Sequence, residues 1–326
     1  MRYPPIAALL LTAVPAAAQD RPVLTVYTYD SFPTEWGPGP AIEPAFEELC
    51  GCDLRLVAAG DGAALLSRLQ LEGPSTEADV VLGLDTALTA AARDTGLFMP
   101  HGLTPELDLP VAWDDPDFLP FDWGAFAFVG HADTPAPASF EELAASDLSI
   151  LIEDPRSSTP GLGLLLWVKA AYGDRAPEIW EGLADNIVTV TPGWTEAWNL
   201  FLEGEADAVL SYTTSPSYTA IVEGDDSQVA WAFDEGNYMQ VEVAGIVAGT
   251  DQPELAQQFM AFMTTDAFQA AIPQTNWMFP AVMPEAGLPE GFAAPPAAGA
   301  SLLMAPEEAQ AVRDGALEEW RTALSR

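Results

Sequence analysis

Hydrophobic and polar positions follow two different periods in the first third of the chain. Short runs of β-branched and aromatic residues predict strands at residues 23–29, 54–58 and 78–84. The stretches that follow them have the patterning of helices, at residues 41–49, 62–71 and 86–95. Strands and helices that alternate in this order form a parallel sheet with right-handed crossovers. The pattern therefore predicts an α/β fold.

A second set of alternating elements begins near residue 139. Its pattern predicts four helices and three strands, at residues 140–145, 160–172, 176–184 and 195–202 and at residues 149–152, 187–190 and 206–212. Beyond this set, apolar residues recur at helical spacing. They predict one or two helices within residues 253–272 and a last helix at residues 306–324.

Two longer extended segments lie at residues 121–130 and 238–248. A chain that leaves a lobe once and returns to it once can hinge at those two crossings. We therefore predict two lobes joined by two crossing segments that form a hinge. Approximate boundaries place residues 19–122 and 246–285 in lobe 1, and residues 123–245 and 286–326 in lobe 2.

The first 18 residues have the pattern of an export signal. One positive charge precedes an apolar run at residues 6–14, and Ala16 and Ala18 match a small-residue cleavage site. The run is shorter than the roughly 18 apolar residues that a membrane-spanning helix needs. The first cysteine is Cys50, so the signal does not end in a lipid-attachment motif. We predict a cleavable signal peptide at residues 1–18 and a periplasmic protein.

The charge balance is strongly acidic. Asp and Glu outnumber Lys and Arg by 49 to 11, which gives a formal net charge of -38. Such a surface repels nucleic acid and anionic membranes and favours small cations. We therefore expect no nucleic-acid partner. Adaptation to a salty habitat would produce the same bias without any ligand, so the net charge alone does not identify a ligand.

Cysteine and histidine are scarce. Cys50 and Cys52 flank Gly51, and two cysteines so close together cannot form a metal cage. His101 and His131 are isolated in the sequence, so we predict no metal site. In an oxidising compartment the cysteine pair could form a local disulfide, and a reduced pair is the alternative.

Aromatic residues gather on loops that follow predicted strands. Tyr29 ends the first strand, and Trp36 lies in the proline- and glycine-rich segment after it. Loops at the carboxyl ends of strands are where open α/β sheets bind their ligands. Four more rings have a similar setting in short turns, and they are Trp194, Tyr212, Tyr218 and Trp277. These rings could close a hydrophobic core, or they could line a cleft for a flat organic cation.

Two polar positions at helix starts each have two interpretations. Asp61 precedes Gly62 at the start of a predicted helix, where its carboxylate could cap the helix or contact a ligand. Ser158 belongs to DPRSSTPGLG, which follows a predicted strand and opens another helix. The exposed amides of that helix start suit an anion, and capping alone explains the serines equally well.

Several of these runs occur together in one known family. The chain resembles the periplasmic thiamine-binding proteins of bacterial ABC importers in LTVYTYDSF, WGPGP, DGAALLSRLQLEG, DPRSSTPGLGLLLW, SYTTSPSY and NWMFP, in collinear order. The resemblance implies a two-lobed periplasmic binding protein of type II, a fold shared with iron(III)-binding proteins and thiaminase I. It implies thiamine, thiamine monophosphate or thiamine diphosphate as the transported ligand, and no cofactor. It also implies an inner-membrane ABC permease and its ATPase as partners of a monomer.

The resemblance also assigns ligand contacts. One wall of the cleft would consist of Tyr29, Trp36, Asp61 and Gly62. The Asp61 carboxylate would accept a hydrogen bond from the aminopyrimidine or balance the thiazolium charge. The rings that would stack on the ligand are those of Tyr212, Tyr218 and Trp277. A phosphate ester of thiamine would lie near Ser158 and Trp194.

Two other functions compete on the same fold. A thiaminase I-like enzyme needs a cysteine nucleophile in the cleft, but both cysteines here lie in the CGC motif after an early helix. A ferric-iron-binding protein needs adjacent tyrosinates with His or carboxylate ligands. Tyr212 and Tyr218 are six positions apart, and neither histidine is near them in sequence. We therefore predict a binding protein without catalytic residues.

Overall fold

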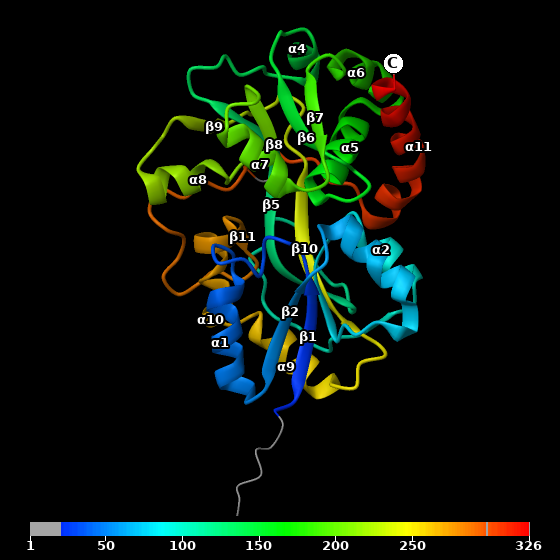
Figure 1. The fold of residues 1–326 in the computed structure, drawn as a ribbon, viewed down its shortest axis with the longest axis vertical. Coiled ribbons are helices and arrows are strands. Elements are labelled where there is room, and N and C mark those ends of the chain that lie inside the picture. The colour runs from blue at the N-terminus through cyan, green and yellow to red at the C-terminus, as the bar shows by residue number, and fades with distance from the viewer. Residues whose placement is uncertain (1–20, 298, 326) are drawn as a thin grey trace, which may run out of the picture.

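The fold was analysed in a computed structural model, which describes residues 21–297 and 299–325. The predicted signal peptide at residues 1–18 lies outside the described residues. Figure 1 shows two lobes stacked along the long axis, with the long strands β5 and β10 near the centre. The α/β class predicted from the alternating pattern is confirmed.

Eleven strands of the described chain join in one open sheet. Their bounds are β1 Val23–Thr28, β2 Asp53–Ala58, β3 Val80–Asp85, β4 Phe98–Met99, β5 Phe118–His131, β6 Ile150–Glu153, β7 Ile187–Thr191, β8 Ala208–Tyr212, β9 Gln228–Ala230, β10 Met239–Val247 and β11 Phe279–Pro280. The main order is β2-β1-β3-β10-β5-β8-β6-β7. Strands β1, β2 and β3 pair in parallel, as do β6, β7 and β8, whereas β5 and β10 run antiparallel to their neighbours.

Strand β5 belongs to both halves of the sheet, the lower half with β1, β2, β3 and β10 and the upper half with β6, β7 and β8 (Figure 1). Its residues 118–125 pair with β10, and its residues 126–130 pair with β8. This change of partner lies within the extended segment expected at residues 121–130. Strand β10 pairs only with β3, β4 and β5, so the chain returns to the lower half just before Met239. There the Tyr238 carbonyl accepts a hydrogen bond from the Phe126 N–H at 2.8 Å.

A third passage connects the two halves. Strand β11 pairs with β5 in the lower half, and the chain then runs up to the C-terminal helix α11 (Pro306–Leu324), which packs against upper-half helices. On its way, Leu302 pairs with Tyr238 beside the second passage. The exact lobe boundaries given above stay a prediction.

Helices cover both faces of the sheet. Their bounds are α1 Gly39–Cys50, α2 Gly62–Glu72, α3 Thr89–Asp94, α4 Phe140–Ala144, α5 Thr159–Tyr172, α6 Ala176–Leu183, α7 Trp194–Leu202, α8 Pro216–Tyr218, α9 Pro253–Phe262 and α10 Asp266–Gln269. Two π-helical turns lie at Thr219–Glu223 and Ile272–Asn276. No helix within the described residues is long and apolar enough to cross a membrane.

Helix α1 ends at the predicted cysteine pair. Gly51 has φ 66° and caps the helix through its N–H, which donates to the Glu47 carbonyl at 2.9 Å. A positive φ of this kind suits glycine, which has no Cβ. Cys50 and Cys52 form a disulfide across this turn, which is the oxidised state of the two alternatives.

Helix α5 is the most deeply buried helix of the upper lobe. Its residues 159–168 are all buried and mostly apolar, so no face of its first ten positions is left for water. Gly163 lies close against the sheet, because a Cβ there would lie 2.1 Å from the Phe126 ring. Phe126 in turn packs on Tyr212, with 5.1 Å between ring centroids. Because Gly163 has no side chain, α5 can pack against Phe126, directly behind Tyr212.

Replacing Gly163 by Ala should destabilise the fold by about 1 to 3 kcal/mol, because the methyl group overlaps a ring that cannot move freely. The measurement is urea unfolding at pH 7. The matched control is Gly315→Ala in α11, where no atom apart from its chain neighbours and its own helix backbone lies within 4 Å of the added Cβ. That change should stabilise the protein by about 0.5 to 1 kcal/mol through helix propensity. Equal effects at both positions would contradict the packing argument.

Candidate functional site

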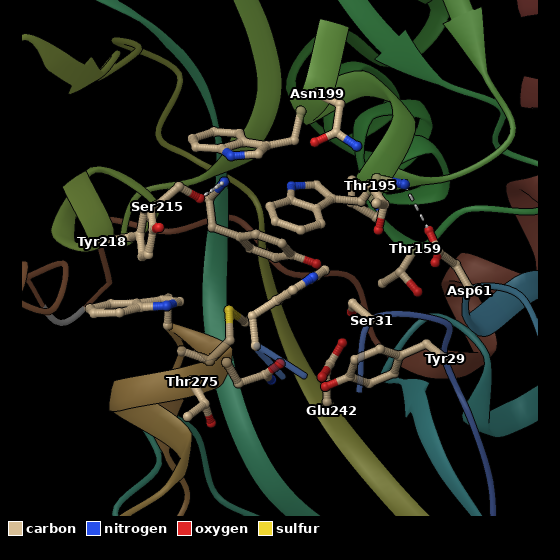
Figure 2. Close-up of a pocket in the computed structure, with 18 of the residues that line it drawn as sticks. Tyr29, Ser31, Asp61, Thr159, Thr195, Asn199, Ser215, Tyr218, Glu242 and Thr275 are labelled. Atoms are coloured by element: carbon tan, nitrogen blue, oxygen red, sulfur yellow. Dashed lines mark hydrogen bonds between the residues drawn. The ribbon is translucent and has the colours of Figure 1, made fainter. Parts of the chain in front are cut away.

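A cavity of about 300 Å³ lies between the two halves of the molecule. Its walls come from the loop after β1, the starts of α2, α5 and α7, the end of β8, and the segment before β11. The lining side chains are Tyr29, Ser31, Trp36, Asp61, Thr159, Pro160, Trp194, Thr195, Trp198, Asn199, Leu202, Tyr212, Ser215, Tyr218, Glu242, Thr275, Asn276, Trp277 and Met278. Figure 2 shows Tyr218 and Thr275 on one side and Asp61 and Thr159 on the other.

Seven of the nine predicted site residues line this cavity. They are Tyr29, Trp36, Asp61, Trp194, Tyr212, Tyr218 and Trp277. Gly62 and Ser158 do not line it, but both lie directly behind the lining. The Gly62 N–H donates to the Thr159 hydroxyl at 3.1 Å, and the Ser158 hydroxyl donates to Asp61 Oδ2 at 2.9 Å. The segments carrying these residues are far apart in sequence and meet only in the fold.

Two groups of contacting aromatic rings belong to the cavity wall. In one group, the Trp194 ring stacks on Trp198 with 5.6 Å between centroids and lies 6.3 Å from Trp36. In the other, Tyr218 meets Trp277 edge to face at 5.4 Å. The sequence reasoning missed Trp198, although its position four residues after Trp194 places both rings on one face of a helix.

The backbone at Trp277 is strained. Its φ of 56° is the one positive value found at a non-glycine residue in the described chain. It follows the π-helical turn Ile272–Asn276, which carries Thr275 and Asn276 into the cavity wall. A bulky residue in the left-handed region costs about 1 to 3 kcal/mol and persists where the surroundings impose it, often at functional sites. The strain therefore supports a ligand role for this turn.

A row of carboxyl groups crosses the sheet beside the cavity. Glu242 on β10 lies directly opposite Asp85 on β3 and opposite Asp122 on β5. All three side chains are buried, and each has one oxygen without a hydrogen-bond donor. The sequence reasoning missed Glu242 and Asp122 as site residues. The sequence feature that could have identified them is a carboxyl group within an otherwise apolar strand, which is rare in a strand buried on both faces.

The cavity has no positive side chain to balance these acids. No Lys, Arg or His is among the described residues that line it. Burial raises the pKa of Asp122 to about 7, and burial with the nearby Asp122 charge raises the pKa of Glu242 well above its usual range. Burial and the Glu242 charge likewise raise the pKa of the Tyr29 hydroxyl. The site therefore favours a bound cation.

Asp61 links the two halves of the molecule. It occupies the N-cap position of α2, but its side chain makes no capping hydrogen bond. Instead, its Oδ2 accepts from the Ser158 hydroxyl at 2.9 Å and from the Trp194 N–H at 3.2 Å, at the starts of α5 and α7. Burial raises its pKa to about 6, against the lowering effect of these two donors. The Ser158 side chain likewise makes no capping bond to its own helix.

The described residues of this site do not form a set of metal ligands. No group of three or more His, Cys, Asp or Glu residues suited to a metal ion occurs within residues 21–297 and 299–325. Tyr212 and Tyr218 lie on the same cavity but belong to different wall segments. The two cysteines of the described chain are joined in a disulfide, so neither is a free thiol.

The sequence matches a known protein family over most of its length. Bacterial extracellular solute-binding proteins match at residues 37–270. The chain belongs to this family.

Individual relatives of this solute-binding protein have names that specify a ligand. The thiamine-binding periplasmic protein of Salmonella typhimurium is 50% identical over 331 residues, which covers 100% of this chain and 99% of that one. A solved periplasmic thiamin binding protein superposes with a TM-score of 0.91 at 49% identity, covering 97% of this chain and 100% of that one. These relatives confirm the resemblance found in the sequence. They are named as binding proteins, and this chain is likewise a binding protein and not an enzyme.

A more distant structure shows the fold alone. Iron-bound HitA from Pseudomonas aeruginosa superposes with a TM-score of 0.74 at 20% identity, covering 93% of this chain and 99% of that one. The predicted two-lobed periplasmic binding protein fold is thereby confirmed.

Replacing Asp61 by Asn should make the ligand-free solute-binding protein more stable at pH 7. The folded-state pKa of about 6 lies above the ordinary 3.8, so the stability that this group contributes is full below pH 4 and is lost as the pH rises through 6. Asn does not ionise and can accept both hydrogen bonds. The stability difference between variant and wild type should therefore grow by about 2 to 3 kcal/mol from pH 4 to pH 7.

Urea unfolding at the two pH values measures this difference. The control is Asp114→Asn, an exposed acid in the loop before β5, which should show no such change. A difference that stays constant between pH 4 and pH 7 would mean that Asp61 is ionised in the folded protein without cost.

Proposed function

We propose that this protein captures thiamine in its interlobe cavity, in the periplasm, and delivers it to an ABC import permease with its ATPase. The observation that carries the proposal is a cavity that combines aromatic walls with buried, unbalanced carboxyl groups. Thiamine consists of a flat aminopyrimidine and a permanently charged thiazolium ring. Ring faces and carboxylates both attract such a cation. The names of relatives at about half identity support the same ligand.

The two rings of thiamine match the two parts of the cavity. The thiazolium would lie toward Glu242 and Tyr29, whose polar ends adjoin one another in Figure 2. The aminopyrimidine would lie against the edge-to-face pair of Tyr218 and Trp277. Asn276, which donates to Asp122 at 2.7 Å, connects these two parts. Closure of the lobes would exclude water from both rings and strengthen the charge interaction.

Thiamine phosphates would reach the starts of α5 and α7. Ser158 and Trp194 would then donate to phosphate oxygens, and the N-termini of the two helices suit an anion. In the described structure the Asp61 carboxylate already accepts from both donors. A phosphate group would therefore have to take the place of this carboxylate. The monophosphate and diphosphate are proposed as ligands on that condition.

The alternative functions have weaker support. A thiaminase I-like reaction would need a free thiolate, whereas both cysteines of the described residues are in the disulfide after α1. Ferric-iron binding rests on likeness to an iron-bound structure at 20% identity, which concerns the fold. Transport of a ligand by a monomer that returns it unchanged agrees best with the cavity.

Native mass spectrometry of the purified protein, followed by calorimetry, tests the proposal. We expect one thiamine per chain, recovered unchanged after release, and weaker or equal binding of the monophosphate and diphosphate. Cleavage of thiamine in the presence of an amine or thiol acceptor would contradict the transport function. A bound ferric ion and no affinity for thiamine would favour the iron alternative.

Replacing Trp277 by Leu should weaken thiamine binding by about ten- to thirtyfold. Leucine keeps much of the apolar area but has no ring face for a cation, and such a contact is worth up to about 2 kcal/mol in a desolvated site. Calorimetry at pH 7.5 measures the affinity. The control is Trp113→Leu, a partly buried tryptophan outside the cavity. Unchanged binding with a lower melting temperature would place Trp277 among the core residues.

A further inference from the structure

Two carboxyl groups face each other beside the cavity. Asp122 and Glu242 are direct partners in the antiparallel pairing of β5 with β10, so their side chains point to the same face of the sheet. Both are buried, at 0% and 5% exposure. Asp122 Oδ2 accepts from Asn276 at 2.7 Å, and Glu242 Oε1 accepts from Gln240 at 3.2 Å. Asp122 Oδ1 and Glu242 Oε2 have no donor.

The surroundings of this pair supply no positive charge. The titratable groups that face it are Tyr29 after β1, Asp85 on β3 and Tyr212 on β8. Each of these groups is neutral when protonated and negative when ionised. Asp61 faces the same cavity from the start of α2. Among the described residues, Arg313 of α11 is a cation whose charge acts on Asp85.

Two adjacent carboxyl groups in such a site cannot both ionise. Like charges in a low-dielectric interior repel strongly, so the empty site keeps at least one proton on the pair. The pKa of Asp122, raised by burial to about 7, agrees with this state. The proton also gives one carboxyl group a donor for the unpartnered oxygen of the other. A cation that binds beside Glu242 offsets the repulsion between the two carboxylates, so both carboxyl groups can then ionise.

We propose that the Asp122 and Glu242 pair releases a proton to solvent when the thiazolium ring of thiamine binds. The step is an exchange of one positive charge for another: an O–H bond of a carboxyl group breaks, its proton passes to the buffer, and the carboxylate keeps the electron pair beside the thiazolium. The inference rests on the proposed function for the identity of the ligand. It adds that the pair selects for charge, because a neutral ligand cannot replace the proton.

Calorimetry in two buffers of different protonation enthalpy measures the exchange. Thiamine binding at pH 6.5 should release between about half a proton and one proton. By linkage, the association constant should then rise between pH 5.5 and pH 7.5, by up to about tenfold per pH unit. The probe without a permanent charge is 4-amino-5-hydroxymethyl-2-methylpyrimidine, the aminopyrimidine half of thiamine, used at pH 7.5, where its ring nitrogens are not protonated. Its binding at that pH should release no proton.

Variants locate the released proton. In the double variant Asp122→Asn with Glu242→Gln neither side chain titrates, so proton release should disappear and the affinity should become independent of pH. Thiamine affinity at pH 7.5 should fall at least tenfold, and affinity for the neutral pyrimidine should fall less. Asp61→Asn is measured beside it, because Asp61 also lines the cavity and its pKa is also raised. Glu153→Gln, a buried carboxyl outside the cavity, is the control with unchanged binding.

The outcomes separate the two proposals. If thiamine does not bind at any pH, the proposed function fails. If thiamine binds tightly but releases no proton, and its affinity is the same at pH 5.5 and pH 7.5, only the proton exchange is overturned. Proton release that disappears with Asp61→Asn and persists in the double variant would also overturn it, because Asp61 would then be the titrating group. The wild-type measurement is decisive even if the double variant does not fold.

Discussion

The pairing of one strand with two different neighbours sets the position of everything else in this molecule. Residues 118–125 of β5 bond to β10, and residues 126–130 bond to β8. Because backbone hydrogen bonds fix register, this single strand fixes the distance between the two halves of the sheet. The cavity lies beside the point of change: Tyr212 pairs with Phe126, while Glu242 pairs with Asp122 four residues earlier. Aromatic and acidic walls are therefore parts of one hydrogen-bonded framework.

The acidity of the chain has two physically different parts. Most of the 49 acidic residues lie on the surface, where water and salt screen them, and they alone set the charge that a salty habitat would explain. Asp85, Asp122 and Glu242 are buried in the sheet and cannot be explained in that way. Buried carboxyl groups without positive partners, such as Asp122 and Glu242, reduce stability, and proteins retain such a cost at functional sites. The net charge and the cavity charge thus have separate origins.

The sequence allowed most element positions to be predicted, because local periods determine them. Helices 62–71 and 160–172 differ by one residue at their ends from α2 and α5. Loop aromatics such as Tyr29 were found for the same reason: strands end at recognisable turns. What could not be predicted was contact between distant segments. Nothing near Asp61 indicates that its carboxylate binds Ser158, 97 positions away, and nothing local shows that Glu242 meets Asp122.

The order of strands also determines when each half can be completed. Strand β10 lies between β3 and β5, although more than a hundred residues separate it from either of them along the chain. The lower sheet therefore cannot close until the upper-half strands β6, β7, β8 and β9 have been synthesised. Contacts between such distant segments carry a large loop-closure entropy and make folding slow. The strands of the upper half can pair from contiguous sequence first, and β10 then fills the position between β3 and β5. The binding cavity, which needs Glu242 of β10, can be assembled only after that step.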